Sequence, residues 1–215
     1  MGSGLGVIGR IITSDECVAE GAEFLAGIEP RFAKALTLTG PLPLRLRGDG
    51  FTPLLDAIVS QQISVAAADA IWQRMKKARL VGPRKIKQAS EAELRACGLS
   101  GQKIRYARAL AGSGIRYSAL RDMPDNEVVT SLTQVTGIGA WTAEIYAMFS
   151  LGRADVFAAG DLALQESARM LFDLNARPTE KQLRFMAQDW SPWRAVAARL
   201  LFAYYRVEKQ RQGIK

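Results

Sequence analysis

The sequence contains no histidine, only two cysteines and no long apolar run, and each shortage excludes a class of protein. Without histidine there is no Ser-His-Asp triad, no histidine-ligated zinc and no histidine general base. Any acid–base chemistry must therefore use Asp, Glu, Lys, Tyr or Cys. Cys17 and Cys97 are too few for a four-cysteine iron–sulfur or zinc site, and they predict a reducing compartment without a disulfide framework. No stretch approaches the ~18 apolar residues of a membrane span.

The chain carries a surplus of positive charge. Among its 215 residues, 29 Lys and Arg stand against 21 Asp and Glu, which gives a net charge of +8. This balance favours a polyanionic partner such as nucleic acid, although many basic proteins bind none. The N-terminus lacks the apolar core and cleavage site of a signal peptide. We expect an intracellular, cytoplasmic monomer that contacts no membrane and that, in a bacterium, associates with the nucleoid.

Caps and apolar periodicity predict helices throughout the chain. Residues favoured as N-caps precede several periodic segments, and those at 90–93 and 179–182 complete the spacing of a capping box. The expected N-caps are Ser14, Ser64, Ser90, Thr179 and Ser191. No segment alternates as a strand would, and most links between helices are short. The sequence therefore predicts an all-α protein.

The most informative stretch is residues 132–164, LTQVTGIGAWTAEIYAMFSLGRADVFAAGDLAL. Gly137 and Gly139 interrupt a helical pattern, and glycine allows both positive φ and close approach of a ligand to the backbone. Amides at the start of the following helix can bind a phosphate, and the Thr142 hydroxyl can add a donor. The same pattern also fits an ordinary tight turn between helices with glycine as a C-cap.

Asp161 ends the stretch in apolar surroundings. It can be a simple N-cap, for which Asp is favoured, or a carboxylate held beside a cleft. Asp155 can instead be a structural acid at a helix end. Among the aromatic residues, Trp141 and Trp193 can pack in the core or stack on an extruded base. The adjacent Gln61 and Gln62 can cap a helix or enter the base stack.

Four segments in this order resemble the helix-hairpin-helix (HhH-GPD) DNA glycosylase superfamily, and within it the DNA-3-methyladenine glycosylase II branch. They are AIVSQQISVAAA, GLSGQKIRYARALA, the stretch 132–164 and SPWRAVAARLLF. The resemblance implies a two-lobed all-α fold with the active site in the interlobe cleft. The whole chain, 1–215, would be one glycosylase unit. Residues 14–50 and about 165–215 would form the terminal-helix lobe, and about 51–164 the helical barrel lobe containing the hairpin 132–146.

The resemblance also assigns roles to individual residues. The catalytic aspartate of the family falls on Asp161, and the residue inserted into the duplex falls on Gln62. The expected DNA-binding residues are Gly137, Gly139, Trp141, Thr142, Gln61, Gln62, Ser64 and Lys103. The expected base pocket contains Trp141, Trp193, Leu162 and Ile145, the last two at positions that are aromatic in larger relatives. No side-chain metal site or required cofactor is expected, but main-chain carbonyls near Thr133, Val135 and Ile138 can hold a structural sodium or potassium ion.

Departures from the family pattern narrow the activity that the resemblance implies. Bifunctional relatives have a nucleophilic lysine where this chain has Trp141, so we expect no strand cleavage at abasic sites. The four-cysteine loop of two other branches is missing. The resemblance thus implies a monofunctional enzyme that hydrolyses alkylated purines, such as 3-methyladenine and 7-methylguanine, from damaged double-stranded DNA in base excision repair. The alternatives are a non-catalytic DNA-binding module and a glycosylase for deaminated or oxidised bases.

Overall fold

The computed structural model of the chain describes residues 8–211, the side chains of Val65 and Arg211 excepted. Helices form nearly all the regular structure of this range, which contains no strand beyond an isolated bridge between Ile11 and Arg153. The predicted all-α class is therefore confirmed. No helix within 8–211 is both long enough and apolar enough to span a bilayer.

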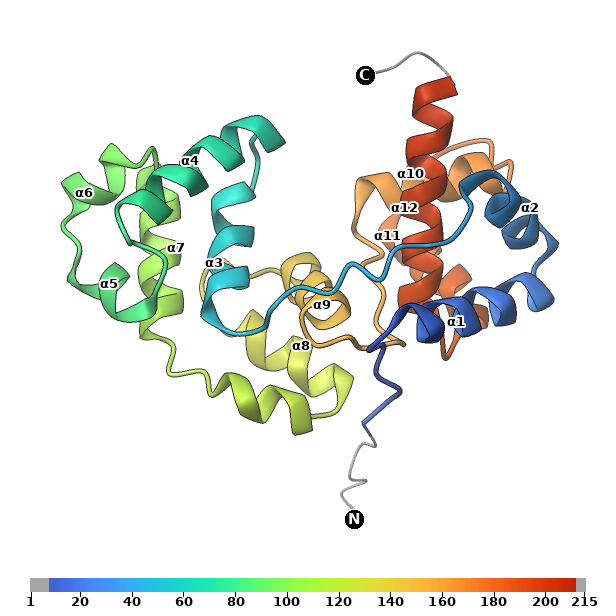
Figure 1. Cartoon of the computed structure of the whole chain (residues 1–215), viewed down its shortest axis with the longest axis horizontal. Helices are drawn as coiled ribbons and strands as arrows, with labels where there is room; N and C mark the ends of the chain where they lie inside the picture. Colours follow the sequence, from blue (N-terminus) through green and yellow to red (C-terminus); the bar gives the residue numbers. More distant parts are fainter. Residues whose placement is uncertain (1–7, 212–215) are drawn as a thin grey trace. The chain divides into compact units, whose positions relative to one another are not determined.

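The helices belong to two compact units (Figure 1). Unit 1 comprises the described residues up to Leu46 and those from Ala147 onward, and unit 2 comprises Arg47–Tyr146. Unit 1 contains α1 (Asp15–Ile28), α2 (Pro30–Thr39), α10 (Leu162–Leu171), α11 (Glu180–Met186), the 3₁₀ helix η2 (Ala187–Trp190) and α12 (Arg194–Arg211). Unit 2 contains α3 (Phe51–Ser60), α4 (Val65–Lys77), α5 (Pro83–Gln88), α6 (Glu91–Ala96), α7 (Gly101–Gly112), the 3₁₀ helix η1 (Tyr117–Asp122) and α8 (Asp125–Thr133). Helix α9 (Ala140–Phe149) crosses from unit 2 into unit 1.

Local capping explains where many of the helices begin. The predicted N-caps Ser14, Ser64, Ser90 and Thr179 each accept a backbone N–H of the first turn, and the capping boxes at Ser90 and Thr179 are complete. The prediction for Ser191 is wrong. Its hydroxyl donates to Asp155 Oδ2 at 2.8 Å, and the last helix begins only at Arg194. Because the Ser191 hydroxyl donates to the Asp155 carboxylate, Ser191 does not cap the last helix.

Unit 1 is organised around α12, which packs against α1, α2 and α10 (Figure 1). The ring of Trp190 meets three phenylalanine rings at centroid distances of 5.2 to 5.8 Å, those of Phe32, Phe157 and Phe172. The fully buried guanidinium of Arg199 donates to the carbonyls of Leu44 and Ala195. Burial, with a smaller contribution from Arg45, lowers the pKa of Arg199 to about 10. These hydrogen bonds attach the extended segment after α2 to α12.

Unit 2 is organised around α7, which packs against α3, α5 and α6. Its buried side is formed by Ile104, Ala107 and Leu110, which are three residues apart and share one face of the helix. The opposite side of α7 carries Arg105 and Arg108, which are exposed. Helix α7 lies among α3, α5 and α6. Its side chains can therefore reach the loops at the ends of these three helices.

The boundary between the units differs from the predicted one. The sequence predicts that the terminal-helix lobe resumes at about residue 165, whereas unit 1 resumes at Ala147. The reason is long-range backbone pairing, in which Gly152 accepts from the Ile12 N–H at 2.7 Å and the Ala154 N–H donates to Arg10 at 2.9 Å. Helical periodicity does not reveal such pairing. Asp161 consequently belongs to unit 1 rather than to the predicted barrel.

Candidate functional site

The turn between α8 and α9, which we call the hairpin, is stabilised by its own backbone. The Ile138 N–H donates to the Val135 carbonyl at 2.9 Å, and the Ala143 N–H donates to the Gly139 carbonyl at 3.0 Å. Gly139 is therefore the residue from which α9 begins. Amides in the first turn of a helix have no acceptor within the helix, and they carry the positive end of its dipole. The hairpin thus offers a backbone site suited to a phosphate.

The two glycines of the hairpin meet different constraints. Gly137 has φ +96°, and a Cβ placed on it would lie 2.2 Å from Cγ of Tyr106. Gly137 therefore has no room for a side chain, because the ring of Tyr106 occupies that space. Gly139 has no such contact, because a Cβ there would find no heavy atom within 4 Å. Gly139 is exposed, so its lack of a side chain leaves room for a group from outside.

A hollow of about 330 Å³ in unit 2 gathers several predicted site residues. The Gln61 amide lies at its edge and donates from Nε2 to the Gly137 carbonyl at 3.0 Å. Gln62 is exposed and has φ +57°, which is uncommon for a residue with a side chain. The complete lining is Gln61, Gln62, Gln102, Lys103, Tyr106, Gly137, Ile138 and Gly139. The structure therefore brings the hairpin and the glutamine loop together within one unit.

Lys103 and Ser64, both predicted to bind DNA, have partners inside the protein. The Lys103 ammonium donates to the Val59 carbonyl at 2.5 Å, in the last turn of α3. Burial lowers the pKa of Lys103. The Ser64 hydroxyl accepts the Ala67 N–H at 3.2 Å as the N-cap of α4, and the residue stays exposed. These contacts give both residues a role in shaping the loop between α3 and α4.

Three predicted residues follow one another in α9 with different exposure. The side chain of Trp141 is 40% exposed, which suits a platform for stacking. Ile145, one turn later, is half-buried. Thr142 is only 3% exposed, and the contact of its hydroxyl with a phosphate stays a prediction. Thr142 lies on the buried side of α9, a distinction that its position near the hairpin did not reveal.

In unit 1, the two candidate aspartates have separate surroundings. Asp155 accepts from Nε and Nη2 of Arg194, each at 2.7 Å, and is therefore a structural acid. Asp161 is half-buried and caps α10, where Oδ1 accepts from the N–H groups of Ala163 at 2.8 Å and Leu164 at 3.1 Å. The cap reading of Asp161 is thus confirmed, and it fixes the carboxylate at the start of the helix. Leu162, which comes next, is 61% exposed.

Trp193, predicted to line a base pocket, lies in the core of unit 1. It is 2% exposed, and the Arg10 guanidinium lies 4.6 Å from its ring centroid. A Cβ on Gly21 would come within 2.7 Å of the ring, so the tryptophan packs directly on the backbone of α1. The prediction for Trp193 is therefore wrong. A contact with α1, more than 170 residues earlier in the chain, decides its burial.

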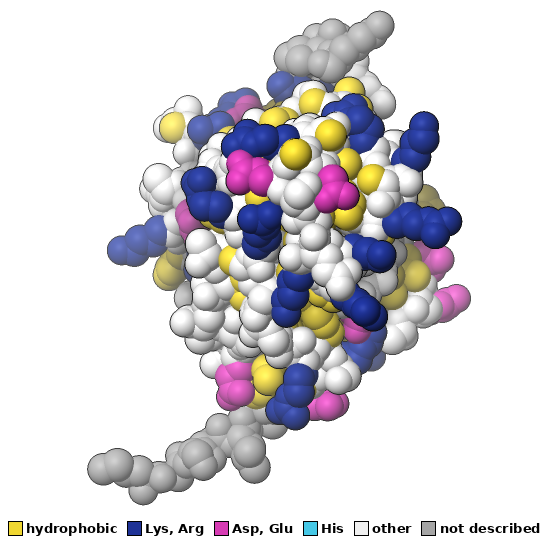
Figure 2. Space-filling model, turned by 90° about the vertical axis from the view of Figure 1, so that its left-hand side faces the viewer, with side chains coloured by type: hydrophobic (Ala, Val, Ile, Leu, Met, Phe, Trp, Pro, Cys, Tyr) yellow, Lys and Arg dark blue, Asp and Glu magenta, His cyan; other side chains and the backbone are white. Residues whose placement is uncertain are grey.

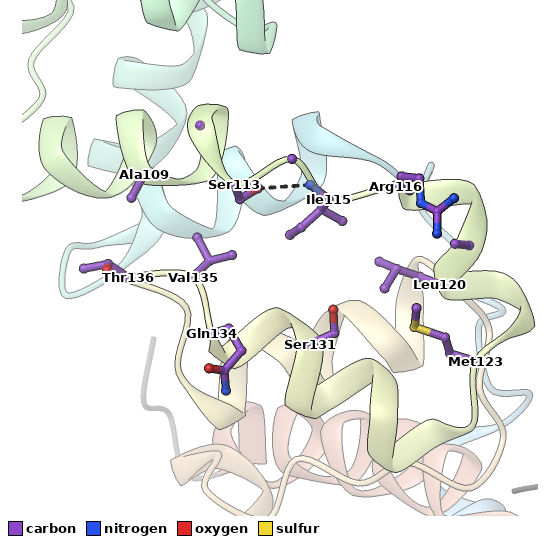
Figure 3. A pocket seen from close by; sticks show the side chains of 13 residues that line it. Ala109, Ser113, Ile115, Arg116, Leu120, Met123, Ser131, Gln134, Val135 and Thr136 are labelled. Atoms are coloured by element: carbon purple, nitrogen blue, oxygen red, sulfur yellow. Dashed lines mark hydrogen bonds between the residues drawn. The ribbon is translucent and has the colours of Figure 1, made fainter.

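A larger hollow of about 530 Å³ lies on another side of the hairpin in unit 2 (Figure 3). The side chains of Ile115, Leu120 and Val135 face into it, and the Ile115 N–H donates to the Ser113 hydroxyl at 3.4 Å beside it. Of the predicted site residues, only Val135 lines this hollow. The smaller hollow therefore has the stronger claim to function. Within the part of the chain that the structure describes, no group of three or more Cys, Asp or Glu side chains could hold a metal ion.

Positive charge is concentrated in one segment of unit 2. Residues 74–108 contain eleven of the 29 Lys and Arg and two of the 21 Asp and Glu. Figure 2 shows Lys and Arg side chains spread over the face that lies to the left in Figure 1, where α4, α5 and α6 are found. A surface of this kind attracts a polyanion without reading its sequence.

Comparison with known proteins now decides the family. Residues 55–192 match the family described as HhH-GPD superfamily base excision DNA repair protein. The chain belongs to this superfamily. It is 31% identical over 187 residues to DNA-3-methyladenine glycosylase 1 of Schizosaccharomyces pombe, a match that covers 81% of this chain and 82% of that protein.

Solved structures agree with this membership in the HhH-GPD superfamily. The 3-methyladenine DNA glycosylase of Schizosaccharomyces pombe in complex with abasic DNA superposes with a TM-score of 0.75 at 30% identity, covering 85% of this chain and 95% of that one. The DNA-3-methyladenine glycosidase of Bacillus halodurans gives a TM-score of 0.77 at 29% identity, covering 94% of each chain. The resemblance to this superfamily drawn from the sequence is confirmed.

Two residues beside this HhH-GPD hairpin were missed by sequence reasoning. The ring of Tyr106 covers Gly137, and its hydroxyl accepts from Gln102 Nε2 at 2.7 Å. Both side chains line the smaller hollow. The signal was present in the motif GLSGQKIRYARALA, where Gln102 and Tyr106 have the spacing of neighbours on one helix face. Lys103 and Tyr106, three residues apart, share a face in the same way.

Proposed function

We propose that this protein is a monofunctional DNA glycosylase that hydrolyses alkylated purines, of the 3-methyladenine and 7-methylguanine type, from double-stranded DNA. One observation carries the proposal: the similarity to a DNA-3-methyladenine glycosylase extends over 81% of this chain and 82% of that protein. A similar structure, at 30% identity, is a complex with abasic DNA. Abasic DNA is what remains when a base has been removed.

The chemistry requires little from the protein. Alkylation at N3 or N7 gives the purine a positive charge, and the base leaves with the electron pair of the glycosidic bond as a neutral molecule. The sugar then carries oxocarbenium charge until water adds at C1′ and loses a proton. An enzyme for this reaction has to expose the nucleotide, hold the cationic base and stabilise the sugar cation.

Three side chains supply these functions in our proposal. Gln62, exposed on its loop, helps to displace the damaged nucleotide. Trp141, 40% exposed, stacks on the cationic base, an interaction worth about 0.5–2 kcal/mol. Asp161, held rigidly as the N-cap of α10, stabilises the sugar cation electrostatically or orients the attacking water. Leu162 and Ile145 would bound the base pocket in place of the aromatic residues of larger relatives.

The backbone of the hairpin supplies the DNA anchor in this proposal. Phosphate binding at Gly139 and the first turn of α9 would position the duplex without selecting its sequence. A sodium or potassium ion on the carbonyls of Thr133, Val135 and Ile138 would steady the turn, and no other cofactor would be needed. We place the protein with the DNA of the cell, as a monomer.

A panel of duplexes tests the proposed function. Each duplex contains one lesion, either 3-methyladenine, 7-methylguanine, a deaminated base or an oxidised base, and free base is measured by chromatography. We expect the protein to release the two alkylated purines and to leave the oxidised base in place. Release of only deaminated or oxidised bases would instead support a glycosylase of different specificity. Binding without release of any base would leave a non-catalytic DNA-binding module.

Trp141 leads to a prediction about strand cleavage. A bifunctional enzyme forms a Schiff base between a lysine and C1′ of the abasic site, which borohydride reduces to a stable cross-link. Because position 141 carries an indole, we expect borohydride to trap no complex of the wild-type protein on abasic DNA. The Trp141→Lys variant, tested in parallel, places an amine at that position. Efficient trapping of the wild type, seen as a shifted band on a denaturing gel, would contradict the monofunctional assignment.

A further inference from the structure

The loop between α3 and α4 places two side chains in solvent and fixes the backbone on either side of them. Gln62 and Ile63 are exposed, Ile63 by 38%. Gln62 has φ +57°, a left-handed backbone conformation that is unfavourable for a residue with a Cβ. After these residues, Ser64 caps α4. A strained conformation persists only when its surroundings hold it in place.

Two side chains make contacts that hold this loop. Gln61 Nε2 donates to the Gly137 carbonyl at 3.0 Å, and this hydrogen bond joins the loop directly to the hairpin. The Lys103 ammonium donates to the Val59 carbonyl at 2.5 Å, two residues before Gln61. A cation at the end of α3 also interacts favourably with the negative end of the helix dipole. Both contacts lie within unit 2.

Helix α7 completes the connection. Tyr106 lies one turn after Lys103, and its ring covers Gly137 so closely that a Cβ there would lie 2.2 Å from Cγ. Lys103 thus holds the end of α3 and Tyr106 covers the hairpin, while Gln61 links the loop to the hairpin directly. The Gln62 loop and the hairpin are therefore held to each other directly through Gln61 and indirectly through α7.

We propose that Gln61 and Lys103 are positioning residues, which fix the Gln62 loop against the hairpin, and that neither of them binds DNA. A phosphate held on the hairpin then sets where Gln62 meets the duplex, so that anchoring and base displacement are coupled. This role deepens the proposed glycosylase function and rests on it. It also differs from the DNA contact that the sequence predicts for both residues.

Salt dependence separates a positioning lysine from a phosphate-binding one. Each phosphate contact contributes about 0.9 to the slope of log K against log salt concentration. Loss of a phosphate-binding lysine therefore lowers the slope by about 1 and weakens binding to every sequence alike. Loss of a positioning lysine leaves the slope unchanged and reduces base displacement instead.

The experiment compares Gln61→Leu, Lys103→Met, Lys103→Arg and the double variant Gln61→Leu/Lys103→Met with wild type. Lys34→Met, at an exposed position on α2, is the matched control for the loss of a lysine. Affinity for an undamaged duplex is measured by fluorescence anisotropy over a series of salt concentrations. Displacement is measured at saturating protein on a duplex with 2-aminopurine beside a stable abasic analogue, because 2-aminopurine brightens when it leaves the stack. Base release from 7-methylguanine DNA is followed in single turnovers, and urea unfolding checks that each variant is folded.

We expect the 2-aminopurine signal and the single-turnover rate to fall about tenfold in Gln61→Leu and Lys103→Met, as for loss of one hydrogen bond of ~1–1.5 kcal/mol. The salt slopes stay at the wild-type value, and Lys103→Arg, which keeps a donor, retains most of the signal. The double variant loses less than the product of the single losses, since both residues hold one loop. Lys34→Met behaves as wild type.

A slope lowered by about 1 in Lys103→Met, with unchanged fluorescence, would overturn the proposal and restore a phosphate contact. Wild-type fluorescence in a folded Gln61→Leu would overturn it as well, even if Lys103→Met failed to fold. If wild type released no alkylated base, the proposed function would fail, and the fluorescence and salt measurements would still decide the role of the two residues.

Discussion

Replacement of Asp161 by asparagine is expected to lower the release of alkylated purines by about 10²–10³-fold or more. The substitution keeps the cap of α10, because an Asn Oδ1 can accept the N–H groups of Ala163 and Leu164 as the carboxylate does. It removes the negative charge that would face the sugar cation in the transition state. We therefore expect the free energy of unfolding and the affinity for DNA to stay nearly unchanged. Single-turnover release of free base, with urea unfolding in parallel, measures both effects.

Asp155→Asn is the matched control for Asp161→Asn, since it removes the other aspartate of the same segment. Asp155 binds Arg194 through two hydrogen bonds of 2.7 Å, so its replacement should lower the free energy of unfolding by about 1–3 kcal/mol. The rate of base release by the folded enzyme should stay at the wild-type value. Normal turnover by Asp161→Asn would show that its carboxylate acts only as a cap.

Alanine at the two hairpin glycines is expected to separate folding from DNA binding. Gly137→Ala places a Cβ 2.2 Å from Cγ of Tyr106 at φ +96°, and it should reduce the free energy of unfolding by about 3 kcal/mol. Gly139→Ala meets no atom within 4 Å, so it should cost about 1 kcal/mol or less, as expected for alanine at an N-cap. The methyl group would, however, stand where a phosphate approaches the backbone, and affinity for DNA should fall about tenfold or more.

Urea unfolding and fluorescence anisotropy with a short duplex distinguish the two hairpin variants. The pair serves as its own control, because the same atom is added two residues apart. Wild-type affinity for DNA in Gly139→Ala would contradict the phosphate site on the hairpin. Wild-type stability in Gly137→Ala would show that Tyr106 moves aside without cost.

Features that depend on neighbours in the sequence were predicted well. N-caps such as Ser64 and Ser90 satisfy amides only two or three residues away, so their identity and position suffice. The hairpin follows from the spacing of Gly137 and Gly139. The resemblance to the superfamily was drawn from four ordered motifs, and this resemblance implied the all-α fold.

Features that depend on distant partners could not be predicted. Trp193 is buried because Gly21 admits its ring, and Lys103 is held by a carbonyl 44 residues away. The residues next to Trp193 and Lys103 in the sequence do not identify Gly21 and Val59 as their partners. Thr142 shows a related difficulty, since the buried side of a short apolar helix such as α9 cannot be chosen from its own sequence. The roles of Asp161 and Gln62 in catalysis and base displacement stay predictions that the experiments above address.

The division of the chain has a consequence for its synthesis. Unit 2 is a continuous segment, Arg47–Tyr146, inserted into unit 1, which combines the two ends of the described chain. All of unit 2 has left the ribosome when Tyr146 emerges, whereas α1 and α2 wait for α12, the last helix of the described residues. The apolar side chains of α1 and α2 that pack on α12 therefore stay uncovered through most of translation, and pairing over such a distance in the chain is slow. Newly made molecules would acquire the part with the hairpin before the part with Asp161.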